Sequence, residues 1–488
     1  MATNNMNGWD VVSLVTIPFI NATIENQGTS PPMLEISTDT MQIQGSFGTW
    51  QVTTGGGPDI LIFNMPLNVI IGKVSKNGEI ITQFDYQKLT ARVELTLKFI
   101  DTGAGGQNLV VDAKNPPTSV MSLLDSSGRP LSNELDDAYI KEALTDWFAA
   151  NLSDFNHCFA SLDLDPSVDG NMQWAFCKPA VVAYTYVSGD TLSNSYLGLL
   201  YNTSGNATPG TVAQIDPSFI PPGCEAAFML SPAMFLSNFL APSTAAQFGI
   251  PQGWLSIDTN GMSISLAGGV QVNLPQVTGS DSDQYQPVMN SMEVVVEGSI
   301  MTMYASTATV VLDKWYGTVT AYDSSQSWMT LALDQSSQGL AYVNTQPSIS
   351  NHTIEKSEGF EILQDILEAI GIITLVVATI LTDGAALLFV GALAGLAQGG
   401  VQWGLAWFED NHQNDAPEIT TLVSNLNLPV TWTGAGPFET TQAGLCQGAF
   451  FLAGELRPGS PNLKDLRSRI QRPGNDQSTP AFGSRARG

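Results

Sequence analysis

The residues of this chain that could do chemistry are few and widely spaced. Its three histidines, His157, His352 and His412, do not form H-E-x-x-H or a comparable metal-ligand spacing. Its four cysteines contain no C-x-x-C pair, which argues against both a zinc site and a dense disulfide framework. We therefore expect no metal and no cofactor.

Sequence motifs of catalytic sites are also missing. There is no G-x-S-x-G elbow, no P-loop, and no G-x-G-x-x-G that opens a helix. A Ser-His-Asp triad is defined by geometry rather than by residue order, so a single sequence does not eliminate one. Because no pattern supports a triad, we predict no catalytic residues and interpret the chain as a binding protein.

The composition favours half-exposed sheets and argues against nucleic acid as a partner. Hydrophobic residues make up 43% of the chain and charged residues 13%, about half the usual charged share of a globular protein. The formal net charge is −27, and residues 457–488 hold seven basic and two acidic residues, which leaves −32 on residues 1–456. Such a body repels polyanions at long range, so membrane contact would need apolar side chains, low pH or the basic tail.

Alternating apolar and polar residues predict sheets over much of the chain, notably at 34–102, 270–310 and 314–342. The alternation is strictest at residues 93–99, where every second residue is apolar. The apolar positions there are Val93, Leu95, Leu97 and Phe99. These four side chains are candidates to line an apolar groove, although the same alternation would serve side chains that fill a core.

Helices are predicted at 17–25, at 133–152 and from Ser231 onward. Thr16 offers a side-chain cap to the first helix, and Ser231 followed by Pro is a strong start for the third. The third helix carries two further candidates for the apolar groove, Phe235 and Phe239.

The largest change in composition begins at Glu358. Residues 358–382 start with an amphipathic helical pattern and become uniformly apolar, and a second uncharged run of 25 residues covers 384–408. As a helix, the second run would be about 37 Å long, enough to cross a bilayer core of about 30 Å. We predict a hydrophobic helical hairpin over 358–408 with its tip at Asp383.

This hairpin has two alternative roles, which the sequence leaves open. It packs on a sheet or covers a cavity as a soluble element, or it inserts into a membrane when its acidic residues become protonated. The candidates for membrane or partner contact are Ile370, Ile373, Val377, Leu388, Phe389, Trp403 and Trp407. The candidates for a pH switch are Glu361, Asp365, Glu368 and Asp383.

The N-terminus has no basic stretch followed by an apolar core, so no secretory signal peptide is predicted. The basic tail, residues 457–488, is rich in Pro, Gly, Ser and Arg and is predicted to be disordered.

Two motifs resemble those of the clostridial forty-seven-kilodalton protein family. The first is the opening GWDVVS at residues 8–13, followed by FINATI at 19–24. The second is GCEAAFMLSPAMFL at residues 223–236, which is similar to the strand that leads into a helix midway along members of that family. The resemblance covers residues 8–456, and the Arg-rich tail departs from the pattern.

The resemblance implies a tubular lipid-binding (TULIP) fold, in which strongly curved antiparallel sheets wrap around long helices and leave an apolar groove. It indicates an α+β, TULIP-like body over 1–456. In one possible arrangement, this body consists of two subdomains that meet near 170–230. The hydrophobic hairpin, 358–408, is inserted in this body, and the tail at 457–488 follows it. Members of the family are encoded beside clostridial neurotoxins or insecticidal toxins, together with related orfX products, and are regarded as accessory proteins.

Three functions are consistent with these patterns. The first is a non-enzymatic accessory protein of a bacterial toxin system that binds a lipid or another apolar ligand. The second is a toxin component that inserts into a membrane through the hairpin, and the third is a scaffold for protein–protein assembly. The expected partners are a lipid or apolar ligand and related toxin-cluster proteins, with conditional membrane contact and no nucleic acid. We expect synthesis in the bacterial cytoplasm. Release together with a toxin complex is an alternative that the sequence leaves open.

Overall fold

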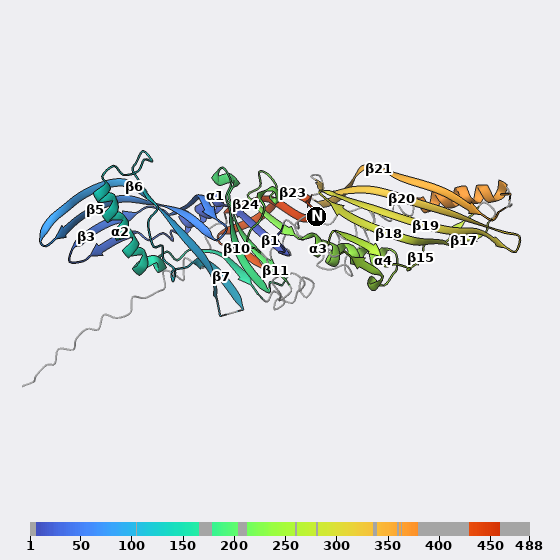
Figure 1. The fold of residues 1–488 in the computed structure, drawn as a ribbon, viewed down its shortest axis with the longest axis horizontal. Helices are drawn as coiled ribbons and strands as arrows, with labels where there is room; N and C mark the ends of the chain where they lie inside the picture. Colours follow the sequence, from blue (N-terminus) through green and yellow to red (C-terminus); the bar gives the residue numbers. More distant parts are fainter. Residues whose placement is uncertain are drawn as a thin grey trace, which may run out of the picture.

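The computed structural model describes residues 6–103, 105–164, 178–203, 212–258, 261–279, 282–334, 339–358, 361–362, 364–378 and 429–458. Most of these residues lie in antiparallel strands, which form three large sheets and one two-stranded sheet within the described ranges. Figure 1 shows the large sheets following one another along the long axis of an elongated molecule. The prediction of a mostly antiparallel fold is therefore confirmed.

The N-terminal sheet lies at one end and has the order β2-β3-β5-β6-β7-β9-β22, with β4 on β5 and β8 on β6. Its strands are β2 (Met33–Ser37), β3 (Met41–Phe47), β4 (Gln51–Gly57), β5 (Ile60–Lys76), β6 (Glu79–Asp101), β7 (Gly106–Val111), β8 (Ser122–Leu124), β9 (Cys158–Asp163) and β22 (Val430–Trp432). The turn between β5 and β6 places Asn77 and Gly78 at positive φ, as an Asn-Gly hairpin turn requires.

Helix α2 (Glu134–Asn151) packs on this sheet, where the sequence predicts a helix over 133–152. Asn133 caps it by accepting hydrogen bonds from the backbone N–H groups of Leu135 and Asp136. Side chains three or four residues apart along α2 are buried, among them Ile140, Leu144, Trp147 and Phe148. Local capping and apolar spacing are thus enough to define this helix.

The central sheet has the order β10-β11-β1-β12-β24-β23 and joins distant parts of the chain. Its strands are β1 (Val11–Thr16), β10 (Val181–Val187), β11 (Tyr196–Asn202), β12 (Ala226–Leu230), β23 (Ala435–Cys446) and β24 (Ala449–Pro458). All residues of β1 are buried between β11 and β12. The meeting of two subdomains near 170–230 stays a prediction; the described part of that range contributes β10 to β12 to this sheet.

Helix α1 (Ile17–Gln27) follows β1 directly and confirms the first predicted helix, but one detail of the prediction is wrong. Thr16 makes no side-chain capping hydrogen bond. Its side chain is buried, and its backbone N–H donates to the carbonyl of Glu225, so Thr16 serves the central sheet instead. Pro18, which has no N–H, reduces the number of donors that the helix start must satisfy.

The distal sheet forms the opposite end of the molecule, with the order β13-β14-β18-β19-β20-β21 and β15 on β18. Its strands are β13 (Leu255–Ile257), β14 (Ser263–Leu266), β15 (Val272–Asn273), β18 (Pro287–Glu297), β19 (Ile300–Lys314), β20 (Gly317–Asp334) and β21 (Gly339–Lys356), and the small neighbouring sheet pairs β16 (Val277–Thr278) with β17 (Gln284–Tyr285). Between the central and distal sheets, the third predicted helix is confirmed and has three parts. These are α3 (Pro232–Phe235), capped by Ser231, a π-helix (Leu236–Leu240) and α4 (Ala241–Gln247).

Residues 364–378 form the last described helix, which lies beside β21 at the far end of the distal sheet (Figure 1). It corresponds to part of the first arm of the predicted hairpin. The second arm at 384–408, the tip at Asp383 and the tail at 459–488 lie outside the described residues. The hairpin as a whole therefore stays a prediction.

Candidate functional site

The most unusual side chains lie where the helix of residues 364–378 covers the buried face of the distal sheet. We call this the inner face; on β19 it consists of Met301, Met303, Ala305, Thr307 and Thr309, which are all buried. The helix is fixed there by Ile370, which packs with Val319 and Ala321 of β20. The helix thus packs directly on this face of the sheet.

The polarity of the inner face changes along the strands. On β19, Met301 and Met303 give way to Thr307 and Thr309 with increasing residue number, and Ala305 lies between them. The partners of this face on β20 change in the same direction; in register from the apolar end they are Met329, Ser327, Ser325 and Asp323. On β18 the partners at the apolar end are Val296, Val294 and Met292. The strip from Met301 to Thr309 is therefore amphipathic along its length, and beyond its polar end the β20 side of the face is apolar again at Ala321 and Val319.

A row of three polar residues marks the polar end. Thr307, Asp323 and His352 are direct register partners on β19, β20 and β21. His352 Nδ1 lies 2.8 Å from Asp323 Oδ1 and 2.9 Å from Oγ1 of Thr374 on the helix. This polar row therefore connects three strands to the helix that covers them.

Several polar atoms of the row are buried without a hydrogen-bond partner. They are Asp323 Oδ2, His352 Nε2, Thr307 Oγ1 and, one position further along the same face of β19, Thr309 Oγ1. Asp323 is only 4% exposed. A buried carboxylate whose second oxygen has no donor is costly in free energy, so this grouping calls for an explanation beyond packing.

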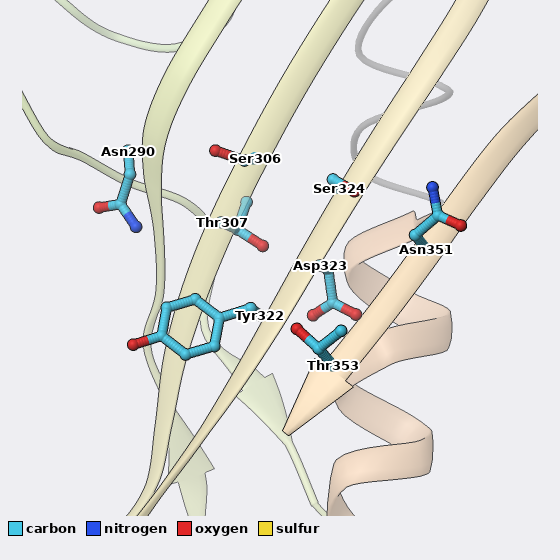
Figure 2. Close-up of a pocket in the computed structure, with 8 residues that line it drawn as sticks. All are labelled: Asn290, Ser306, Thr307, Tyr322, Asp323, Ser324, Asn351 and Thr353. Atoms are coloured by element: carbon cyan, nitrogen blue, oxygen red, sulfur yellow. The ribbon is translucent and has the colours of Figure 1, made fainter. Parts of the chain in front are cut away.

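A polar pocket of about 130 Å³ lies on the outer face of the same strands. Figure 2 shows its eight lining residues, which come from β18 to β21 and are Asn290, Ser306, Thr307, Tyr322, Asp323, Ser324, Asn351 and Thr353. The volume exceeds what a single small polar group needs. Ser306, Ser324 and Asn351 are register partners one position away from the row, so their side chains point to the opposite face of the sheet and the pocket is separate from the inner face.

The groove candidates from the sequence lie elsewhere, in other parts of the main core. Val93, Leu95 and Leu97 on β6 are at most 5% exposed and belong to the main core, and Phe99 is partly buried against it. Phe235 and Phe239 are fully buried, and the Phe235 ring stacks on Phe450 of β24 with centroids 5.7 Å apart. The structure therefore does not bring these six candidates together at one site, and their role as groove lining stays a prediction.

The hairpin candidates divide into a described and an undescribed group. Ile370, Ile373 and Val377 are buried on the sheet-facing side of the helix. The opposite side exposes Leu367, Ile372 and Leu375, the last at 70%. Leu388, Phe389, Trp403 and Trp407 lie outside the described residues. The described helix is therefore apolar on both its buried and its exposed side.

Three of the four pH-switch candidates lie in the described residues. Glu361, Asp365 and Glu368 are exposed, away from the buried stripe, as the amphipathic pattern predicts. Asp383 lies outside the described residues. None of the three exposed carboxylates is part of the polar row, which the sequence reasoning missed.

Neither a metal centre nor a membrane-crossing helix is found in the described part of the chain. No group of three or more His, Cys, Asp or Glu side chains there could hold a metal ion. None of the described helices is both long and apolar enough to cross a membrane. The arrangement at the polar row can accept and donate hydrogen bonds, and that is the chemistry it offers.

Known proteins share both the sequence pattern and the fold of this chain. The family profile named OrfX-like and described as "Protein OrfX2/OrfX3/P47" matches residues 6–454. Protein OrfX3 of Paraclostridium bifermentans is 24% identical over 494 residues, which cover 93% of this chain and 98% of the relative. Protein OrfX3 of Clostridium botulinum (strain Kyoto / Type A2) is 24% identical over 500 residues, which cover 94% and 99%.

Solved structures agree at the level of the fold. P47 from Clostridium botulinum A2 superimposes with a TM-score of 0.68 at 16% identity, covering 92% of this chain and 98% of that one. P47 of Clostridium botulinum E1 gives a TM-score of 0.62 at 16% identity, covering 92% and 99%. The resemblance to the clostridial forty-seven-kilodalton protein family is confirmed, and the chain belongs to the OrfX2/OrfX3/P47 family.

Proposed function

We propose that this protein is a non-enzymatic, lipid-binding or apolar-ligand-binding accessory component of a bacterial toxin system. Family membership supports the setting, because the resemblance implies gene neighbourhoods that encode toxins. The amphipathic inner face of the distal sheet supports the binding. It combines an apolar strip, a polar end and a covering helix, which are the features that a lipid with a head and a tail would need.

The inner face is the observation that carries this proposal. Its apolar part is built mainly from unbranched, flexible Met side chains at positions such as Met301, Met303 and Met329. Met adapts its shape to irregular partners and is common at binding surfaces that accept several ligands. Ala305, between the Met residues and the polar row, leaves the middle of the strip without a large side chain. Met301, Met303, Ala305 and Met329 are packed in the main core, so a ligand here would displace Met side chains, whose flexibility permits this.

The expected gain in free energy is sufficient for stable binding. Each buried methylene group contributes about 0.8 kcal/mol, so a 16-carbon chain would contribute roughly 12 kcal/mol before the cost of ordering is subtracted. Micromolar binding corresponds to about 8 kcal/mol, so partial burial of such a chain is enough.

The test is lipid extraction and native mass spectrometry of the purified protein, followed by titration with a fluorescent fatty acid and a fluorescent phospholipid. Ala305→Trp should fill the strip and reduce binding at least about tenfold. Ser306→Trp, the neighbouring residue on the opposite face, is the matched control and should leave binding unchanged. Circular dichroism and thermal melting check folding, and Ala305→Leu is a milder substitution at the same site. A wild-type protein that is purified without ligand and binds neither probe would overturn the proposal.

A second candidate function, protein–protein assembly, is favoured by the outer parts of the distal sheet. β21 is the last strand of this sheet among the described residues and exposes Val343, Ile349 and Ile354. At the β19–β20 turn, Trp315 is 96% exposed and packs edge-to-face against Tyr316. Long exposed edge strands and exposed aromatic residues are typical places for protein contacts.

This second function is tested by size-exclusion chromatography with the proteins encoded beside this one. A scaffold would form a stable complex that Trp315→Ala weakens, whereas Lys314→Ala, at the neighbouring position, would have a smaller effect. Failure to co-elute with any of these proteins would count against assembly. Membrane insertion through the hairpin stays a prediction, because its second arm lies outside the described residues.

A further inference from the structure

We infer that the polar row binds the head group of a single-chain amphiphile, that this head group is a protonated amine, and that the tail points toward the Met-rich end of the inner face. The inference rests on the proposed function, which requires only an apolar ligand. It adds the chemistry of the head group and the direction in which the ligand lies.

The row offers mainly hydrogen-bond acceptors. An ionised Asp323 requires a proton on Nδ1 of His352, 2.8 Å away, so a neutral His352 has its lone pair on Nε2. Asp323 Oδ2 and His352 Nε2 are both buried without a partner, and so are the hydroxyls of Thr307 and Thr309. These atoms are a carboxylate oxygen, an imidazole nitrogen and two hydroxyl oxygens, and an ammonium group, which has three donors and no acceptor, is the head group that suits such acceptors.

Charge selects an amine over other head groups. Among the described residues, the ion pair of Asp323 is with His352, which is neutral unless it binds a second proton. With a neutral His352, the row holds an unbalanced negative charge in a setting where Asp323 is 4% exposed. A cation balances this charge, an alcohol supplies one donor without a charge, and a carboxylate is repelled.

The geometry of the inner face sets the direction of the tail. The polar row lies between the apolar strip and the far end of β19, and the strip continues without charged residues from Ala305 through Met303 to Met301. A hydrocarbon chain that leaves the row in this direction meets flexible Met side chains, whereas in the opposite direction Ile370 of the helix already covers Val319 and Ala321. The tail therefore points toward the central sheet.

The helix of residues 364–378 covers the site. Its Thr374 hydroxyl lies 2.9 Å from His352 Nδ1, so the helix helps to hold the imidazole in place beside Asp323. Ile370 and Ile373, on the same side of the helix, are buried and supply an apolar cover. Thr374 is thus a positioning residue, and Asp323 is the residue that contacts the head group.

The experiment compares three ligands that share one tail: hexadecylamine, hexadecanol and hexadecanoate. Their affinities are measured below the concentrations at which they aggregate, with stoichiometry from native mass spectrometry of the full chain. The wild-type protein should bind one hexadecylamine at least about tenfold more tightly than hexadecanol, and hexadecanoate most weakly, because a hydrogen bond to a charged group is stronger than a neutral one.

Variants separate this site from the general negative charge of the protein. Asp323→Asn should bring hexadecylamine to within about twofold of hexadecanol and leave hexadecanol binding unchanged. Asp313→Asn, which removes the same charge from an exposed position of the same sheet, is the matched control and should keep the preference. Ala305→Trp should weaken all three ligands if the tail crosses this position.

The outcomes are distinguishable. Equal binding of the three ligands to the wild-type protein would overturn this inference and leave the proposed function intact. An amine preference that Asp313→Asn reduces as much as Asp323→Asn would also overturn it, since the preference would then come from net charge. If none of the three ligands binds, both the inference and the proposed apolar-ligand function fail. Should Asp323→Asn not fold, Thr307→Val is used instead and should reduce the preference in part.

Discussion

Each end of the molecule buries one carboxylate where a helix meets a sheet, and the two carboxylates are hydrogen-bonded very differently. In the N-terminal sheet region, Asp136 of α2 accepts hydrogen bonds from Thr82 Oγ1, Tyr86 OH and Asn133 Nδ2 at 2.6, 2.6 and 2.8 Å. In the distal region, the only partner of Asp323 among the described residues is His352, which reaches one of its two oxygens.

This difference separates a carboxylate that stabilises the fold from one that is available to a ligand. Both of the Asp136 oxygens have donors, so its burial is compensated. Burial and the nearby Asp136 carboxylate raise the pKa of Tyr86 to about 12, which keeps the phenol protonated as a donor across the physiological range. Asp323 has no such set of donors. Its Oδ2 atom can therefore still accept a hydrogen bond from a ligand, whereas both oxygens of Asp136 already accept hydrogen bonds within the protein.

The apolar parts of the two ends differ in the same way. Under α2, aromatic rings fill the interface: Trp50 lies 4.8 Å from Phe155 and 6.3 Å from Trp147, and Phe47 lies 5.0 Å from Trp147, between ring centroids. Under the helix of residues 364–378, Ile370 packs on Val319 and Ala321, and the inner-face residues of β19 and β20 include no aromatic ring. Large rigid side chains specify one packing arrangement, whereas small and polar ones leave a surface that a guest can complete.

The strongest test of the comparison is to neutralise each carboxylate. Asp136→Asn should destabilise the protein by about 3 kcal/mol, because the amide cannot accept all the hydrogen bonds that the carboxylate receives. Asp323→Asn should change stability by less than about 1 kcal/mol, because it removes a buried charge that has one partner. Urea unfolding without added lipid measures both effects.

The exposed Asp313→Asn provides the reference for loss of a surface charge and should have almost no effect. Equal destabilisation by Asp136→Asn and Asp323→Asn would show that the two carboxylates play the same structural role. In that case the distal row would be a part of the core, and the case for a ligand there would be lost.

Local patterns in the sequence were sufficient for the fold elements but not for the site. The cap at Asn133 and the apolar spacing that follows it are properties of one short segment, so α2 was predicted within one or two residues. The alternation at 93–99 likewise predicted a strand with one buried face, which β6 confirms. The alternation could not show whether that face lines a groove, because a strand face that fills a core has the same apolar side chains.

The polar row depends on pairing between strands, which one sequence does not display. Asp323 and His352 are 29 residues apart and meet only because β20 and β21 pair in one register. That register shifts twice, between Gln326 and Trp328 and between Trp328 and Met329, so counting residues from the turn would not align the two. One feature of the sequence could have indicated the polar row. Asp323 is the charged residue on a face of β20 whose other side chains are uncharged.

A buried histidine at the N-terminal end extends the comparison to pH. His157, near the N-terminal sheet, is fully buried beside Phe155 and Phe159, with Thr29 Oγ1 3.1 Å from its Nδ1. Burial lowers the pKa of His157 to about 3, so the folded protein keeps it neutral while the unfolded chain protonates it near pH 6.5. Because the unfolded state then binds more protons, stability falls as pH falls through this range.

His157→Gln, which retains an amide partner for Thr29, should remove this term. The wild-type protein should lose about 2 kcal/mol more stability than His157→Gln between pH 7 and pH 5. Unfolding in urea at a series of pH values measures the difference, and ionisations shared by both proteins cancel. Parallel pH profiles for the two proteins would show that His157 is not held neutral by burial.

The finest contrast is between two buried threonines, one in α1 and one in the distal sheet. The hydroxyl of Thr23 in α1 donates to the carbonyl of Ile20 at 2.8 Å, whereas the hydroxyl of Thr307 is buried without a partner. Replacing Thr by Val exchanges the hydroxyl for a methyl group of similar shape. Thr23→Val should therefore lower stability by about 1 kcal/mol, and Thr307→Val should raise it by a similar amount in the ligand-free protein. The gain should disappear when hexadecylamine is bound to the wild-type protein, because the Thr307 hydroxyl then has a partner. Melting curves of both variants with and without hexadecylamine measure this, and a loss of stability in ligand-free Thr307→Val would mean that its hydroxyl already contributes to the fold.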